Sequence, residues 1–286
     1  MKHGKASRTA LRVAIRRAAH QLVDRPPVLD DPIAVRLIGP GYERDLERAS
    51  HEVARDFRAF MAARSRYAED RLAQAVATGL GQYVVLGAGL DTFAYRNPFP
   101  AVGVFEADFP ATQEWKQEML AAAAIALPAN LAFVPLDLER KTLLDSLGEA
   151  GFDAMAPAYF SWLGVVPYLT LSGFRSTLEA IAQLPDGSGV TFDYTFPPET
   201  LTPKRRAIFD RLAGRVSAAG EPFQLFFTPV QVEAELRSAG FQRVEQVDHD
   251  GLNELYFRGR ADGLKLSPVG IGMLATAWKG LAPAAG

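Results

Sequence analysis

The stretch Gln82-Tyr83-Val84-Val85-Leu86-Gly87-Ala88-Gly89-Leu90-Asp91-Thr92 changes from a short apolar run into Gly-x-Gly. This pattern is typical of a buried strand whose following turn holds a ligand against bare backbone. Gly87 and Gly89 suit that role because any Cβ would stand in the ligand's way, and ordinary turn glycines are the alternative. The stretch therefore predicts an α/β fold with a nucleotide-type site after its first strand.

The residues after the glycines indicate which nucleotide the site takes. A dinucleotide site has a third glycine and a free helix N-terminus that receives the pyrophosphate. Thr92 holds that place here, with Asp91 beside it and Pro98 soon after. A carboxylate would repel phosphates but attract an ammonium or a sulfonium, and S-adenosylmethionine carries both. We expect Asp91 to bind the ammonium of this cofactor, with helix capping as the alternative.

Three ordered motifs resemble the leucine carboxyl methyltransferase family, and its bacterial branch of small-molecule O-methyltransferases is the better match. They are Leu-Gly-Ala-Gly-Leu-Asp-Thr at 86–92, Phe-Glu-Ala-Asp-Phe-Pro at 105–110 and Pro-Leu-Asp-Leu at 135–138. Similarity at 7–11, 31–34 and 239–241 extends it over nearly the whole chain. The resemblance implies a class I methyltransferase fold, S-adenosylmethionine as cofactor and a small organic acceptor, polyketide-like or another secondary metabolite.

The pattern along the chain predicts two parts. Residues 1–80 read as an N-terminal helical cap, broken by proline and glycine at 25–27 and 39–41. Residues 81–286 read as the core, in which apolar runs alternate with amphipathic segments, with a lid-like insertion at about 196–227. We expect seven strands in a mostly parallel, Rossmann-like sheet with helices on both faces, at 83–86, 102–107, 131–136, 158–163, 189–193, 241–247 and 273–278.

Two helices and one turn are predicted from local signals. Thr228-Pro229-Val230-Gln231 has the capping-box pattern with proline at the first helical position. Residues 139–147 also read as helical, and the polar run 248–251 reads as a turn.

Arg64 lies on the apolar face of a predicted helix. Apolar residues recur around it at spacings of three and four, at Phe57, Phe60, Met61, Ala68 and Leu72. An inward guanidinium needs an anion, either a protein carboxylate or the carboxylate of the bound cofactor. The family resemblance implies the cofactor.

Acidic residues follow the second and third predicted strands. Glu106 and Asp108 are placed to accept the ribose hydroxyls, with surface acids as the alternative. The resemblance favours Asp108, but strand alternation puts both on one side, so both are kept. It also implies that Asp137 and Leu138 hold adenine, through a carboxylate and a backbone amide. A helix N-cap is the alternative for Asp137.

The acceptor side is predicted less specifically. Leu163 stands where many family members carry a glutamate, and Tyr168 matches a family tyrosine at the methyl-transfer region, with a core position as the alternative. Aromatic residues of the insertion are candidates for apolar lining, at Phe196, Phe223, Phe226 and Phe227. Because we find no catalytic base, and an ionised carboxylate acceptor needs none, carboxyl methylation is the hypothesis.

Composition narrows the function classes. The chain has 286 residues, 48% of them hydrophobic, a formal net charge of −2, no cysteine and four histidines. A basic nucleic-acid interface, a thiolate zinc site and a cysteine nucleophile do not fit this composition, and no metal is expected. No apolar run approaches the ~20 residues of a membrane span, so a cytoplasmic location is expected. Two rival functions are an NAD(P)-dependent oxidoreductase and, because of Leu163, an inactive methyltransferase-fold binding module.

Overall fold

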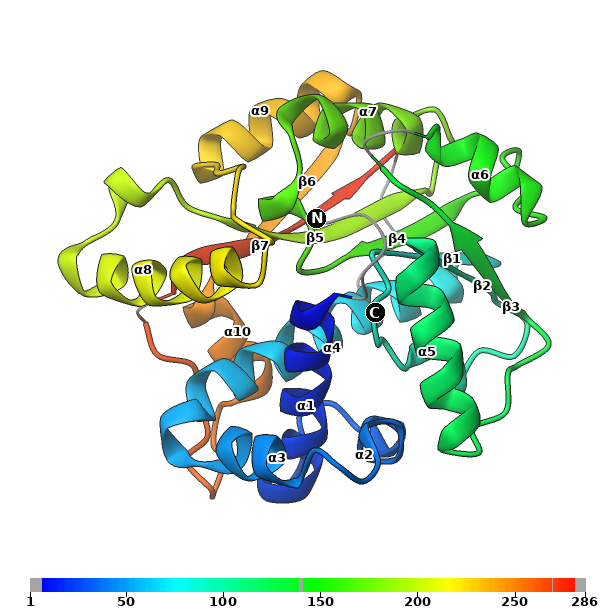
Figure 1. The fold of residues 1–286 in the computed structure, drawn as a ribbon. Helices are drawn as coiled ribbons and strands as arrows, with labels where there is room; N and C mark the ends of the chain where they lie inside the picture. The colour runs from blue at the N-terminus through cyan, green and yellow to red at the C-terminus, as the bar shows by residue number, and fades with distance from the viewer. Residues whose placement is uncertain (1–6, 139–140, 269, 281–286) are drawn as a thin grey trace.

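The computed structural model describes residues 7–138, 141–268 and 270–280, and its centre is one seven-stranded sheet (Figure 1). The strand order is β3-β2-β1-β4-β5-β7-β6, with β7 antiparallel to both of its neighbours. The seven strands confirm the predicted class I methyltransferase fold. Their bounds are β1 (Gln82–Leu86), β2 (Gly103–Asp108), β3 (Leu131–Pro135), β4 (Ala158–Trp162), β5 (Gly189–Thr195), β6 (Arg243–Val247) and β7 (Gly272–Trp278).

The central strands are buried on both faces, which explains their almost continuous apolar sequences. All five residues of β4 are buried, and so are the last four of β1. The core on one face includes Trp162 and Phe174, stacked with ring centroids 5.6 Å apart. On the other face, Tyr159 stacks on Trp278 of β7 at 5.3 Å.

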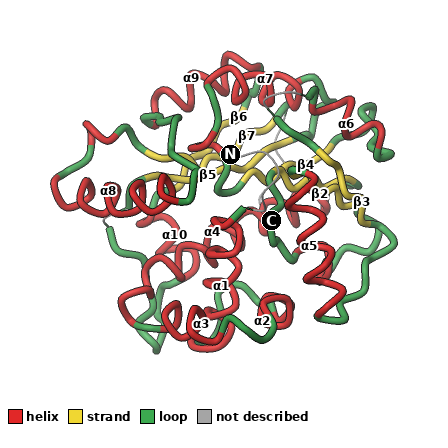
Figure 2. The backbone as a smooth tube through the Cα atoms, in the orientation of Figure 1, coloured by secondary structure: helices red, strands yellow, loops and turns green. Residues whose placement is uncertain are grey.

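Helices cover both faces of the sheet (Figures 1 and 2). On one face lie α6 (Leu143–Glu149), α7 (Leu171–Ala182) and α9 (Pro229–Ala239), and on the other lie α5 (Pro110–Ala122) and α10 (His249–Tyr256). The helices before β1 lie on this second face: α1 (Arg8–Val23), α2 (Pro32–Ile38), α3 (Glu43–Ser50), η1 (Glu52–Ala54) and α4 (Arg55–Ala77). The remaining elements are three short 3-10 helices and one α-helix in the segment 196–227, which the sequence analysis calls the insertion: η2 (Phe93–Arg96), η3 (Val166–Tyr168), η4 (Pro198–Thr200) and α8 (Pro203–Ala218).

Local signals were accurate at α9 and wrong at α10. The predicted capping box at α9 is present, since Thr228 Oγ1 accepts from Gln231 N at 3.3 Å and Gln231 Oε1 accepts from Thr228 N at 2.8 Å. The run 248–251, expected as a turn, instead begins a helix because Asp248 accepts a hydrogen bond from Gly251 N at 2.9 Å. The helix expected at 139–147 is seen from Leu143, and residues 139–140 lie outside the described residues.

The strand order places a crevice beside β1. The chain passes from β1 to β2 and β3 on one side, then returns to place β4 on the other side of β1. Open α/β sheets bind ligands at such a switch point, outside the carboxyl ends of the strands. None of the helices within the described ranges is long and apolar enough to cross a membrane.

Candidate functional site

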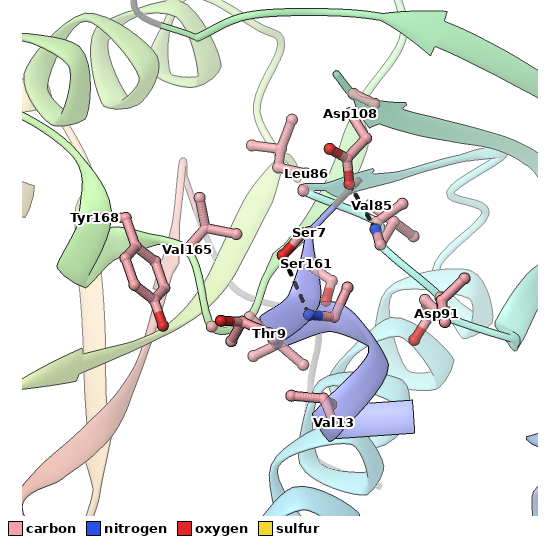
Figure 3. Close-up of a pocket in the computed structure, with 18 of the residues that line it drawn as sticks. Ser7, Thr9, Val13, Val85, Leu86, Asp91, Asp108, Ser161, Val165 and Tyr168 are labelled. Atoms are coloured by element: carbon pink, nitrogen blue, oxygen red, sulfur yellow. Dashed lines mark hydrogen bonds between the residues drawn. The ribbon is translucent and has the colours of Figure 1, made fainter. Parts of the chain in front are cut away.

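A pocket opens at the carboxyl ends of β1 to β4, at the switch point of the sheet (Figure 3). Its floor comes from the ends of these strands and the loops that follow them, at residues 85–91, 107–109, 136–138, 161 and 163–165. Its other walls come from α1, from Arg64 of α4, from η3 and from Glu221 in the loop after α8. The pocket therefore brings together residues from position 7 to position 221.

The glycine loop has a backbone that only glycine fits easily. Gly87 and Gly89 have φ angles of 64° and 49°, in the left-handed region. A Cβ on Gly87 would lie 2.3 Å from a methyl of Val165, and one on Gly89 would lie 2.9 Å from Ala10 Cβ. Both glycines line the pocket as expected, and their backbone also allows α1 and the loop after β4 to pack closely. Their contact with a cofactor stays a prediction.

Asp108 sits at the tip of β2 and faces the pocket (Figure 3). One carboxylate oxygen accepts from Gly89 N at 2.6 Å and the other from Phe109 N at 2.7 Å. Burial raises the pKa of this carboxyl, while the two backbone hydrogen bonds act in the opposite direction. A carboxylate held this way is suited to accept hydroxyl groups of a ribose.

The structure places Glu106 away from the pocket, against α5. Its carboxylate bonds to Lys116 of α5 at 2.6 Å, and both side chains are 1% exposed. Burial raises the pKa of Glu106 to about 7. Alternation does put Glu106 on the same side of β2 as Asp108, but two residues before the strand end, where α5 covers it. It is not among the described residues that line the pocket, so its position does not support a ribose contact.

Asp91 lines the pocket but already has two partners. Its Oδ2 pairs with Arg17 at 2.5 Å and its Oδ1 accepts from Phe93 N at 2.8 Å. Burial opposes ionisation, but Arg17 and Lys116 outweigh it and lower the pKa of Asp91 to about 2. The N-cap of η2 is Thr92, so Asp91 holds the start of this turn from one residue before the cap position. A contact with the cofactor ammonium stays a prediction.

Arg64 reaches the pocket from α4 and is 6% exposed. Its Nη1 donates to Asp193 Oδ2 at 2.8 Å, and the other oxygen of Asp193 accepts from Gly164 N. The protein carboxylate that we considered is therefore present, on β5. Arg64 Nε is buried and has no hydrogen-bond partner in the described part of the chain. This leaves one donor of a cation at the wall without a partner.

The remaining predicted residues line the pocket from two different segments. Asp137 and Leu138 line it after β3, where the resemblance puts adenine. Tyr168 lines it from η3, its ring packs on Phe223 at 5.2 Å, and its hydroxyl lies near Thr9 (Figure 3). The four phenylalanines expected as apolar lining are not lining residues; Phe227, for example, is buried in the core.

Several lining residues were missed by the sequence analysis. Arg17 has the same signal as Arg64, since it falls on the buried face of its helix beside Ala14 and Ala18. Ser161 is the one small polar residue of the otherwise apolar strand β4, and Glu221 lies in a loop without a local motif. No group of acids and histidines within 7–138, 141–268 and 270–280 is arranged to hold a metal ion.

Comparisons with known proteins were made at the level of sequence and of fold. The profile described as leucine carboxyl methyltransferase matches residues 10–182. A Bacillus subtilis protein named as an S-adenosyl-L-methionine-dependent methyltransferase, YktD, is 32% identical over 92% of this chain and 95% of its own length. A Mycobacterium avium protein named in the same way is 32% identical over 70% of this chain and 68% of its own.

Solved structures show the same fold at low sequence identity. Two of them are a structure from Thermobifida fusca YX, described as a methyltransferase, and a structure from Streptomyces avermitilis. The first has a TM-score of 0.59 and 18% identity, and the match covers 98% of this chain and 97% of that one. The second, a DUF574 family protein, has a TM-score of 0.54 and 19% identity over 86% and 94% of the two chains.

Proposed function

This chain belongs to the leucine carboxyl methyltransferase family, and from that premise we propose that it transfers a methyl group from S-adenosylmethionine to an oxygen of a small organic acceptor. The observation that carries the proposal is the pocket at the switch point, which combines a left-handed Gly-x-Gly turn with two carboxylates, Asp91 and Asp108. These charges disfavour a diphosphate and favour a cationic nucleoside.

The residues present fit this cofactor. Gly87 and Gly89 line the pocket and are proposed to lie against its methionine portion. A Cβ at either position would collide with Val165 or Ala10 and displace the turn. Arg64, with an unpartnered Nε at the wall, is proposed to hold the carboxylate. Asp108 is proposed to hold the ribose hydroxyls, and Asp137 with Leu138 the adenine. Asp91 is proposed to contribute its charge toward the ammonium.

Although Leu163 replaces the glutamate of many family members, another carboxylate lies close to this position. Asp193 binds the backbone of the next residue, Gly164, and pairs with Arg64. We propose that Asp193 provides the carboxylate that the family glutamate would supply.

Bound S-adenosylmethionine would supply an electrophilic methyl group on its sulfonium. The chain's own residues orient the reactants and exclude water, which is what an in-line displacement requires. The sequence favoured a carboxylate acceptor because no base was recognised. Glu221 in the pocket wall removes the basis of that preference. We therefore propose methylation of an oxygen atom, and the lack of a recognised base in the sequence no longer favours a carboxylate over a hydroxyl acceptor.

Calorimetric titration of the full chain with S-adenosylmethionine, S-adenosylhomocysteine and NAD tests the cofactor. We expect both sulfur ligands to bind and NAD not to bind; NAD binding without S-adenosylmethionine binding would reject the proposal in favour of an oxidoreductase. Incubation with methyl-labelled S-adenosylmethionine and small hydroxy and carboxylic compounds tests turnover. Cofactor binding without any transferred label would favour the inactive module.

A further inference from the structure

We infer that Glu221, Thr9 and Tyr168 form the acceptor end of the pocket, and that the acceptor is a hydroxyl compound whose proton passes to Glu221. The inference rests on the proposed methyl transfer and specifies its substrate class. Glu221 is a buried acid in the pocket wall, and none of the proposed cofactor contacts involves it.

Glu221 is held in place by contacts from two distant parts of the chain. It follows α8, its backbone N donates to Val216 O at 3.0 Å, and the residue is 8% exposed. Its carboxylate accepts a hydrogen bond from the hydroxyl of Thr9, at the start of α1. Both residues line the pocket, so this contact closes the wall between α1 and the insertion.

Tyr168 belongs to the same end of the pocket. Its hydroxyl lies near that of Thr9 (Figure 3), and the charge of Glu221 acts on it. Burial, with Glu221 contributing, raises the pKa of Tyr168 to about 12. The phenol is therefore protonated at neutral pH. It can donate a hydrogen bond that orients an acceptor oxygen, but it is unsuited to take the acceptor's proton.

The charges around the pocket do not suit a carboxylate acceptor. Two cationic side chains are found among the described lining residues, Arg17 and Arg64. Arg17 already pairs with Asp31 and Asp91, and Arg64 pairs with Asp193. An acceptor carboxylate beside Glu221 would meet a like charge at a poorly hydrated position, without a cation of its own.

An amine acceptor fits less well than a hydroxyl. A carboxylate beside an amine stabilises the protonated ammonium, which has no lone pair for attack. A hydroxyl group is neutral, donates its hydrogen bond to the carboxylate and keeps its lone pairs for the methyl carbon. The acid at this end of the pocket therefore selects a phenol or an alcohol.

The step balances with these groups alone. The acceptor oxygen forms a bond to the methyl carbon as the carbon–sulfur bond breaks, and that electron pair stays on sulfur. The acceptor proton moves to the Glu221 carboxylate and leaves later to water. The products are a methyl ether, a neutral thioether and one proton.

The test compares matched acceptors with the full chain saturated with S-adenosylhomocysteine. The probes are 2-naphthol, 2-naphthoic acid and 2-naphthylmethylamine, with phenol, benzoic acid and benzylamine as smaller counterparts. Calorimetry measures their binding, and labelled S-adenosylmethionine measures transfer. The variants are Glu221→Gln and, as the matched control from the same insertion, Asp210→Asn, whose side chain is 55% exposed.

We expect the hydroxyl compound of at least one series to bind at least ~10-fold tighter than its acid and to receive the label. Glu221→Gln should lower the transfer rate at least ~100-fold, in the range of a lost general base. It should also bring the affinities for acid and hydroxyl compound close together, because the repelling charge is gone. A merely structural role for Glu221 would not change this ratio. Asp210→Asn should match the unaltered chain in both measurements.

Three outcomes would overturn the inference: acids bound as tightly as the hydroxyl compounds, label found on acid or nitrogen, or no binding of any probe to the S-adenosylhomocysteine complex. These differ from failure of the proposed function. In that case the unaltered chain would not bind S-adenosylmethionine or S-adenosylhomocysteine at all.

Discussion

Arg64 is a buried cation that pairs with a protein carboxylate and also faces the proposed ligand. Replacing it with alanine should weaken S-adenosylhomocysteine binding at least ~10-fold, which corresponds to about 1.5 kcal/mol, the lower end for a charged hydrogen bond. Calorimetry measures the affinity, and thermal unfolding verifies the fold. Arg66→Ala is the control, since that side chain is 47% exposed and pairs with Asp70. An unchanged affinity in the folded Arg64 variant would remove this residue from the site.

A substitution at Gly87 tests whether the turn after β1 requires a glycine for steric reasons. Gly87→Ala would place a methyl group 2.3 Å from Val165 in a left-handed backbone, so unfolding free energy should fall by more than the ~1–2 kcal/mol of the backbone alone. Gly79→Ala has a φ of 97° and no atom within 4 Å, and should show only the backbone effect. Urea unfolding compares the two. The extra loss should shrink when Val165→Ala is added; equal losses at both glycines would contradict the steric account.

At the scale of elements, Arg17 links α1 to α2 and to the loop that follows β1. Arg17 pairs with Asp31, the N-cap of α2, and with Asp91 of the loop after β1. Arg17→Ala should destabilise the chain by ~3–5 kcal/mol, because Asp91 loses its ion-pair partner and the buried Asp31 keeps only Arg96, at 3.3 Å. Urea unfolding measures this. Arg8→Ala, an exposed position on the same helix, should leave stability nearly unchanged, and a similar effect of both variants would show that Arg17 does not hold α1 in place.

At the scale of the whole molecule, stability should fall in acid. The pKa values of Asp24 and Asp91 are about 2, because their arginine partners outweigh burial, while an unfolded aspartate titrates near ~3.9. A lowered pKa stabilises the fold above the unfolded value, and that contribution is lost as pH falls toward the folded value. The stability difference between the chain and Asp91→Asn should therefore shrink by about 1 kcal/mol from pH 6 to pH 3, measured by urea unfolding. A constant difference would mean that Asp91 has an ordinary pKa in the folded chain.

Sequence patterns predicted the fold well because its determinants are local. Each strand is a short apolar run, and the α9 capping box lies within four residues. Residues near strand ends, such as Asp108, were correctly expected beside the pocket, and their contact with a cofactor stays a prediction. Contacts between residues distant in sequence could not be predicted, because no local pattern shows that α5 covers Glu106 or that Thr9 contacts Glu221.

The contact between Thr9 and Glu221 joins positions 212 residues apart. Chimeras that exchange the first helices between homologues would import one of these side chains without the other. We expect such hybrids to retain cofactor affinity but to lose discrimination among acceptors. Substitutions at positions 9 and 221 should therefore be correlated among homologues.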